Sequence, residues 1–254
     1  MVGPLTVDLN CDLGESFGRY ILGQDAAIMP LITSANIACG FHAGDPGVMH
    51  STVQLVKQHE VALGAHPGYP DLQGFGRRQM DLTPQEVIDI VIYQVGALSA
   101  FAAGEGIRLV HVKPHGALYN LASKDITIAK AVAQAVSEVN SSLVLVGLAG
   151  SVLVKAGKAL GLQVANEGFP DRAYLSDGQL MPRGLQGAVI HDPKIVAANA
   201  LRLVREGLEI NGKRIKIDTL CLHGDNLNAV ENARKIRQAL EAAGIVISPL
   251  HSGR

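Results

Sequence analysis

Short apolar runs alternate with longer helical patterns along almost the whole of this 254-residue chain. This alternation limits the fold more than any other feature, because strands that are joined by helices form βαβ units and pair in parallel. The runs cover residues 5–11, 31–38, 61–65, 108–113, 143–148, 163–166, 217–222 and 245–247. The helical patterns cover residues 46–59, 84–103, 126–138, 151–160, 193–207 and 227–243. Seven or eight such strands predict an α/β fold of one domain over residues 1–254, a TIM-like β/α barrel, and an open doubly wound sheet is the alternative.

Two of the predicted helices carry start signals. Asp45 precedes Pro46 and Thr83 precedes Pro84, and proline suits the first turn of a helix, where no backbone N–H needs an intrahelical partner. We therefore expect helices to begin at both prolines.

Composition and charge exclude several classes of protein. Hydrophobic residues make up 48% of the chain and charged residues 18%, as in globular proteins. The formal net charge of −1 gives no electrostatic reason to expect nucleic acid or a membrane surface as a partner. No apolar run approaches the roughly 20 residues that span a bilayer, and the N-terminus lacks the pattern of a signal peptide. With three cysteines and no CxxC motif, we expect a reduced, cytoplasmic protein whose cysteines are small buried hydrophobes.

Polar side chains alternate with apolar ones in the first strand, within "VDLNCDLGE". Asp8, Asn10 and Asp12 therefore point to one side of that strand, and Glu15 follows at its exit. An alternating strand of this kind is also found at solvated sheet edges, so the pattern alone does not define a site.

Five further strands carry polar or titratable groups where each strand stops. These groups are Asn36 with His42, His66, Lys113 with His115, Glu167 with Arg172, and His223 with Asp225. A single histidine at a strand end is more often structural than catalytic. In a β/α barrel, however, the carboxyl ends of all strands face one mouth, where active sites lie. The convergence of so many groups at equivalent positions predicts a functional site there.

Recognised nucleotide-binding motifs are absent from the sequence. No stretch matches GxxxxGK[ST], and no GxGxxG follows a predicted strand. The turn "GLAGS", residues 147–151, has the form of a weak anion-binding site. The pair Arg77–Arg78 is either a contact for a substrate carboxylate or phosphate, or a basic pair on the surface.

Six motifs together carry a resemblance to a known family. "DLNCDLGE", "NIACGFHAGDP", "LGAHPGYPD", "VKPHGALYN", "EGFPDRAY" and "DTLCLHGDN" resemble the LamB/YcsF family, over about residues 5 to 247. The resemblance implies a barrel related to the glycoside hydrolase/deacetylase superfamily. It also implies 5-oxoprolinase activity, the ATP-dependent opening of 5-oxo-L-proline to L-glutamate, shared with partner subunits B and C. ATP, with Mg²⁺, would be the co-substrate of the complex.

This reaction needs a base for water, an acid for the leaving nitrogen and a cation for the developing oxyanion. Our candidate catalytic residues are Asp12, Glu15, His42, His66, Lys113, His115 and His223. Our candidate substrate-binding residues are Asp8, Asn10, Asn36, Glu167, Arg172 and Asp225. We expect Asp12 or Glu15 with one histidine to serve as base and acid, Lys113 to stabilise negative charge, and Arg172 to hold the substrate carboxylate. We also expect Lys113→Met to leave the fold intact.

Two other functions remain open at this point. Asp12, His42 and His66 supply one carboxylate and two imidazoles, a set that binds Zn²⁺, Fe²⁺ or Mn²⁺. The first alternative is therefore a stand-alone metal-dependent amidase or deacetylase. A non-catalytic lactam-binding subunit is the other. Because ATP supplies the driving force in the family reaction, we expect catalysis without a tightly held metal. We also expect the isolated chain neither to hydrolyse ATP nor to open 5-oxoproline at a useful rate.

Overall fold

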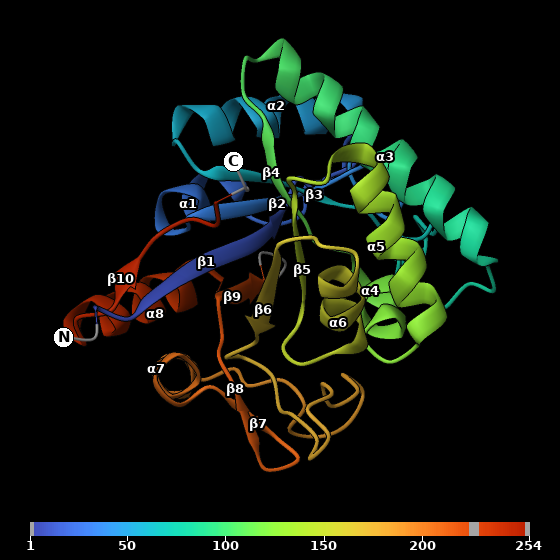
Figure 1. The fold of residues 1–254 in the computed structure, drawn as a ribbon. Helices are drawn as coiled ribbons and strands as arrows, with labels where there is room; N and C mark the ends of the chain where they lie inside the picture. The colour runs from blue at the N-terminus through green and yellow to red at the C-terminus, as the bar shows by residue number, and fades with distance from the viewer. Residues whose placement is uncertain (1–2, 224–228, 252–254) are drawn as a thin grey trace.

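Seven parallel strands close into a barrel in the computed structural model, which describes residues 3–223 and 229–251 (Figure 1). The barrel strands are β1 (Thr6–Leu13), β2 (Ser34–Ala38), β3 (Ala62–His66), β4 (Leu109–Val112), β5 (Val144–Leu148), β6 (Val164–Gly168) and β9 (Thr219–His223). The ring closes because β1 pairs with β2 on one side and with β9 on the other. An eighth parallel strand, β10 (Val246–Ile247), pairs with the first residues of β1. The prediction of a TIM-like barrel is confirmed, and closure rules out the open sheet.

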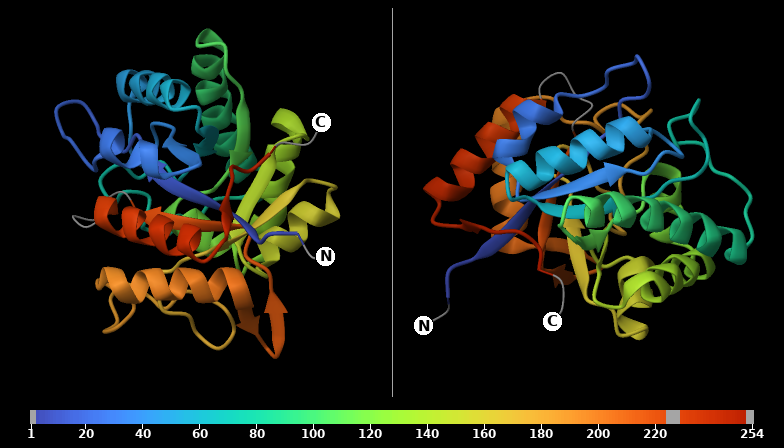
Figure 2. Two further views of the ribbon diagram at one scale, coloured as in Figure 1. Left: turned by 90° about the vertical axis from the view of Figure 1, so that its left-hand side faces the viewer. Right: turned by 90° about the horizontal axis from the view of Figure 1, so that it is seen from above.

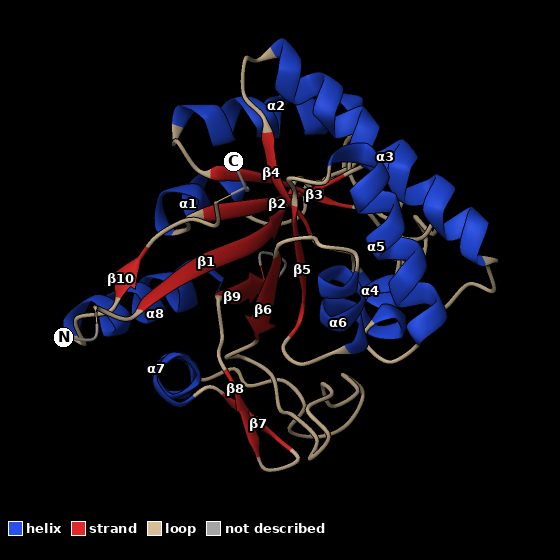
Figure 3. Ribbon diagram, in the orientation of Figure 1, coloured by secondary structure: helices blue, strands red, loops and turns tan. Residues whose placement is uncertain are grey.

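Helices surround the barrel on its outside (Figure 3). The long ones are α2 (Pro46–Gln58), α3 (Pro84–Gly104), α5 (Ile126–Asn140), α6 (Val152–Ala159), α7 (Pro193–Glu206) and α8 (Ala229–Ala242), all of which the sequence predicted. Helices α7 and α8 lie side by side (Figure 2). Residues 227 and 228 of the last predicted helix lie outside the described residues.

Several short elements were not predicted. They are α1 (Asp25–Ile28), the 3₁₀ helix η1 (Met29–Leu31), α4 (Gly116–Ala122), and the hairpin of β7 (Leu208–Ile210) and β8 (Lys213–Ile215). Each is too short to show a hydrophobic period in the sequence.

Both predicted helix starts are confirmed by their hydrogen bonds. The Asp45 carboxylate accepts bonds from the N–H groups of Gly47 and Val48, at 2.8 and 3.0 Å, and so caps α2. Thr83 and Glu86 form a reciprocal capping box at the start of α3.

Helix α3 corrects one expectation about membranes. By length and composition it could cross a bilayer, with a mean hydropathy of 1.7 over 18 residues, whereas no such run was expected. Its residues Val87, Val91, Val95 and Leu98 recur every three or four positions and are fully buried. This is the pattern of a helix that packs one face onto a barrel, and α3 contacts α5, β3 and β4.

Polar side chains fill much of the barrel interior. Leu9, Cys11 and Leu13 of β1 belong to the apolar core between the strands and the helices. The alternate residues Asp8, Asn10 and Asp12 therefore face inward. The interiors of β/α barrels are usually packed with branched apolar side chains, so this interior is unusual.

Asp8 lies at the lower end of this polar column, away from the cavity described below. Its carboxylate accepts hydrogen bonds from Thr33 Oγ1 at 2.7 Å, Ser34 Oγ at 2.6 Å and Thr219 Oγ1. Burial raises the pKa of Asp8 to about 6, although these hydroxyl groups partly offset the rise and Glu167 adds to it. Asp8 therefore joins strands β1, β2 and β9 inside the barrel, and the cavity-lining residues do not include it.

We expect Asp8→Asn to change how stability depends on pH. Between about pH 4 and pH 6 the unfolded chain releases the Asp8 proton while the folded chain keeps it, so stability falls as the pH rises, by about 3 kcal/mol in total. The variant lacks the Asp8 carboxyl group and therefore does not show this fall in stability. Its free energy of unfolding relative to that of the natural chain should therefore increase by about 2 kcal/mol from pH 4 to pH 6. Chemical denaturation at several pH values measures this difference, and a constant difference would contradict the assignment.

Candidate active site

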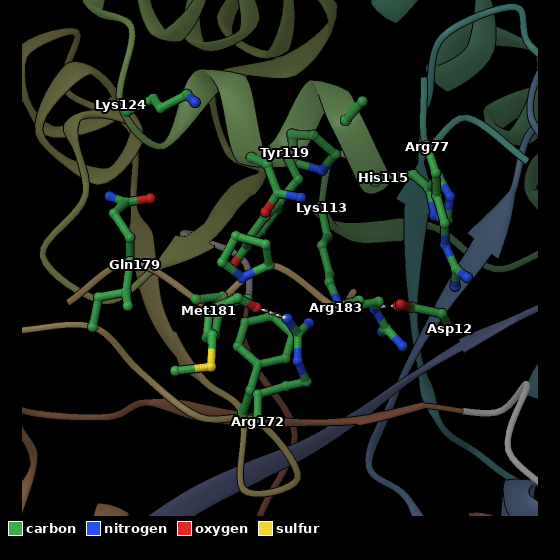
Figure 4. Close-up of a pocket in the computed structure, with 18 of the residues that line it drawn as sticks. Asp12, Arg77, Lys113, His115, Tyr119, Lys124, Arg172, Gln179, Met181 and Arg183 are labelled. Atoms are coloured by element: carbon green, nitrogen blue, oxygen red, sulfur yellow. Dashed lines mark hydrogen bonds and ion pairs between the residues drawn. The ribbon is translucent and has the colours of Figure 1, made fainter. Parts of the chain in front are cut away.

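A cavity of about 590 Å³ opens at the carboxyl ends of the barrel strands (Figure 4). Asp12, His66, Lys113 and His115 form its floor, as the sequence predicted for the barrel mouth. Its walls come from the start of α4 and from the long segment after β6, residues 169–183. Residues from four separate parts of the chain therefore meet in one hollow.

Lys113 is the central cation of the site. Its ammonium lies 2.9 Å from Asp12 Oδ1, 2.8 Å from Glu167 Oε1 and 3.2 Å from Asn10 Oδ1, and it contacts Cys221 Sγ at 3.1 Å. Burial alone would lower the pKa of Lys113, but the charges around it, with Asp12 first among them, hold that pKa well above its usual value. The lysine is therefore charged and held between two carboxylates from β1 and β6.

Tyr119 is a site residue that the sequence analysis missed. Its hydroxyl donates a 2.6 Å hydrogen bond to Glu167 Oε2, and both side chains are buried. Tyr119 lies in α4, one turn after His115, so the motif "VKPHGALYN" contained it. We did not assign it a role because α4 itself was not predicted.

Asn10, Asn36 and His111 form a chain of hydrogen bonds beneath Lys113. Asn36 Nδ2 donates to Asn10 Oδ1 at 2.7 Å and to Asp12 Oδ1 at 2.8 Å, and its Oδ1 lies 2.7 Å from His111 Nε2. The two asparagines, which were expected to bind substrate, contact the groups around Lys113 and are not among the residues that line the cavity. His111 was missed because a lone histidine within an apolar strand gives no signal of a site.

Close packing around His111 depends on a glycine in the next strand. A Cβ on Gly64 of β3 would overlap the His111 ring, so only glycine fits there. Burial first, and then the charge of Lys113, lower the pKa of His111 to about 3. The ring is therefore neutral and donates from Nε2 to Asn36.

Three histidines and a glutamate lie together beside the floor. His66 Nε2 is 2.9 Å from His115 Nδ1, and the rings of His42 and His115 stack at 3.7 Å. Glu15 Oε1 lies 3.8 Å from both His42 Nε2 and His115 Nδ1. Burial lowers the pKa of His115 to about 3 and that of His42 well below its usual range. The structure thus brings Glu15, His42, His66 and His115 together, as expected for residues at adjacent strand ends.

The guanidinium of Arg172 was expected to hold the substrate carboxylate, but it donates hydrogen bonds to backbone carbonyls of the protein itself. Its Nε donates to the Ala188 carbonyl at 3.2 Å, and its Nη2 donates to the Met181 carbonyl at 2.6 Å. These bonds tie the segment after β6 together. They occupy two of the five N–H groups of the guanidinium.

Other basic side chains line the cavity and are exposed. Arg77, Lys124 and Arg183 belong to its walls, and Figure 4 shows Arg77 and Arg183 on the same side of the cavity as Asp12. Arg78, in contrast, pairs with Asp71. The cavity rim therefore favours an anionic ligand.

Two predicted residues cannot be placed. Asp225 lies outside the described residues, and the side chain of His223 does too, although its backbone ends strand β9. The remaining site defines a β/α-barrel protein with a cavity at its mouth, a charged floor and basic side chains on its walls.

Comparison with known proteins identifies the group to which this barrel belongs. The model of the LamB/YcsF family matches residues 7–254. A protein of Heliobacterium modesticaldum, named as the A subunit of 5-oxoprolinase, is 56% identical over 247 residues, which cover 96% of this chain and 97% of that protein. The protein of the same name from Bacillus subtilis is 51% identical over 252 residues and covers 98% of each.

A solved structure agrees with both. The crystal structure of the lactam utilization protein from Thermus thermophilus superposes with a TM-score of 0.89 at 51% identity, over 96% of this chain and 99% of that one. This chain belongs to the LamB/YcsF family, and the resemblance seen in its motifs is confirmed.

The buried charges change what we expect of Lys113→Met. Glu167 is fully buried, so removing the ammonium leaves a carboxylate without its cation, and the substitution should cost about 3–5 kcal/mol. The double variant Lys113→Met/Glu167→Gln removes both charges and should recover most of that loss. Lys155→Met, at an exposed lysine of α6, is the matched control and should change little. Urea denaturation of these variants and of Glu167→Gln measures the coupling, and additive effects of the two substitutions would show that the pair is not coupled.

Proposed function

We propose that this chain is the A subunit of an ATP-dependent 5-oxoprolinase, which hydrolyses 5-oxo-L-proline to L-glutamate together with partner subunits B and C. The observation that carries the proposal is identity of 51–56% to proteins that bear the name of this subunit, over nearly the full length of both chains. The name of the Thermus relative, a lactam utilization protein, agrees with a cyclic amide as the substrate.

The cavity suits the chemistry of such a substrate. 5-Oxo-L-proline carries one carboxylate and one ring amide, and the exposed Arg77 and Arg183 offer partners for the carboxylate. Because Arg172 is engaged by backbone carbonyls, we assign substrate binding to Arg183, with Arg172 holding the wall that carries it.

Hydrolysis of the lactam adds one water across the ring C–N bond. The water oxygen bonds to the carbonyl carbon, the C–N bond breaks, and the nitrogen takes a proton. Lys113 is the cation that stabilises the oxyanion, and the oxyanion reaches its ammonium by replacing one of its present partners. Asp12 on the cavity floor is our candidate for the base that takes a proton from the water and then, as the acid, gives it to the nitrogen.

We assign activation of the amide by ATP, with its Mg²⁺, to a step that involves the partner subunits. In the turn at residues 147–151, polar groups that could bind a phosphate already have partners within the protein. Ser151 caps α6, and the Gly150 N–H donates to Asn166 Oδ1 at 3.2 Å. It does not belong to the lining of the described cavity. A phosphorylated lactam formed with the partners would meet the basic side chains of this cavity. Attack by water and cleavage of the C–N bond would then leave γ-glutamyl phosphate, and a second water would release it as L-glutamate and inorganic phosphate.

Reconstitution tests the proposed function. Glutamate release from 5-oxo-L-proline and ATP should be negligible for the isolated chain and robust when subunits B and C are added. Robust release by the chain alone would favour a stand-alone amidase instead. Full release by subunits B and C without this chain would make it a non-catalytic binding subunit.

Arg183→Gln tests the assigned substrate contact. Losing a charge-assisted hydrogen bond should raise the KM of the complex for 5-oxo-L-proline by about 10-fold or more, with a smaller effect on kcat. Arg205→Gln, at an exposed arginine near the end of α7, is the control and should leave both constants unchanged. An unchanged KM in Arg183→Gln would assign the carboxylate to another cation.

A further inference from the structure

Two histidines at the cavity floor, His66 and His115, approach each other through one ring nitrogen each, and this contact is unfavourable if both rings are neutral. His66 Nδ1 lies 2.7 Å from the Lys113 carbonyl oxygen, and His115 Nε2 lies 2.8 Å from the Phe75 carbonyl oxygen. A carbonyl only accepts, so these two nitrogens carry the hydrogens. In neutral rings, the remaining nitrogens, His66 Nε2 and His115 Nδ1, then present lone pairs to each other at 2.9 Å. Lone pairs at that separation repel unless a cation lies against both.

A third histidine in the same place has no hydrogen bond to satisfy it. His42 is fully buried, and neither of its ring nitrogens has a hydrogen-bond partner among the described residues. Buried polar atoms are nearly always paired, so these nitrogens need an explanation. His42 Nε2 lies 3.8 Å from Glu15 Oε1, which brings a carboxylate to the same point.

Taken together, these groups have the composition of a metal site. Within the described residues, Glu15, His42, His66 and His115 each offer one donor atom, and all four atoms lie within 4.8 Å of one another. We propose that these four residues bind one divalent first-row transition-metal ion, such as Zn²⁺ or Mn²⁺. Imidazole nitrogens with one carboxylate are typical ligands for such ions and not for Mg²⁺.

The surroundings of the cluster fit this role. Metal-binding histidines usually donate their second ring nitrogen to a carbonyl or carboxylate, which fixes the tautomer, and His66 and His115 both do so. Two nitrogens at about 2.0–2.1 Å from one ion are about 2.9 Å apart at a right angle and about 3.3 Å apart in a tetrahedral site. The separation of 2.9 Å between His66 Nε2 and His115 Nδ1 is close to these values.

A glycine in the loop after β3 makes room for the cluster. A Cβ on Gly76 would lie 2.7 Å from His42 Cβ and 2.9 Å from His115 Cδ2, so the loop packs directly onto both rings. Because His66 and His115 also line the cavity, an ion held here would be open to a ligand from the cavity and would act on it as a Lewis acid.

This donor set differs from the one that the sequence suggested. Asp12 was the expected carboxylate, but the donor atoms that lie within 4.8 Å of one another include Glu15 and not Asp12, whose Oδ1 contacts Lys113 and Asn36. The inference also departs from our expectation of a site without a tightly held metal. It does not depend on the proposed function, because it concerns binding of an ion in the absence of substrate.

Metal titration of the purified chain tests the proposal directly. Protein stripped with a chelator and dialysed is titrated with Zn²⁺ and with Mn²⁺ by calorimetry, and bound metal is counted by mass spectrometry. We expect about one ion per chain for at least one of the two metals, a rise in Tm on binding, and no comparable binding of Mg²⁺. His115→Gln and Glu15→Gln should each weaken binding by about 10²-fold or more, beyond the effect of losing an outer-shell partner.

Two other histidines serve as controls. His111→Gln changes a buried imidazole of the same barrel and His59→Gln a partly exposed one, and both should keep the metal. Circular dichroism checks the fold of each variant. Failure of the natural chain to bind either ion would overturn the proposal, and so would unchanged binding by folded His115→Gln and Glu15→Gln. Because no substrate, ATP or partner is present, these outcomes are separate from the test of 5-oxoprolinase activity.

Discussion

A charged lysine inside the mouth of the barrel is the constraint on which the rest of the site depends. Burying the Lys113 ammonium is costly unless opposite charges meet it, and Asp12 and Glu167 do so at 2.9 and 2.8 Å. Asp12 and Glu167 come from β1 and β6, and Lys113 directly follows β4, so the balance exists only when the strands close in this register. Asn36 then holds Asp12, and Tyr119 holds Glu167. The charges at the floor are therefore fixed before any ligand arrives, as electrostatic catalysis requires.

The polar interior is concentrated on one side of the barrel. From β1 to β4 the inward-facing side chains form a hydrogen-bonded column that begins at Asp8 and passes through Asn10 and Asn36. On the other side, Val144 and Val146 of β5 pack against Ala165 of β6 in a small apolar cluster. The functional groups at the mouth are thus oriented by hydrogen bonds to the polar side chains below them. The apolar side supports the strand that carries Glu167.

Much of this arrangement could be predicted from the sequence, and the remainder has physical reasons. Long hydrophobic periods predicted the barrel strands and the outer helices, and strand-end positions predicted that Asp12, His66, Lys113 and His115 would meet. The partners of each side chain depend on the register between strands and on loop paths, which no local pattern encodes. His111 was missed because a lone histidine in an apolar strand gives no signal of a site, and Tyr119 because its helix has only 7 residues. Arg172 was assigned to the substrate, although its guanidinium donates to backbone carbonyls. Glu15, which follows β1, lies 3.8 Å from His42 Nε2.

We propose that 5-oxo-L-proline binds over Lys113 at the mouth of the barrel. A crystal structure of the chain grown with 5-oxo-L-proline tests this most directly. We expect ligand density in the cavity, with an oxygen about 2.7–3.2 Å from Lys113 Nζ and the carboxylate beside an arginine of the wall. Ordered ligand elsewhere on the molecule, with the cavity holding only solvent, would contradict it.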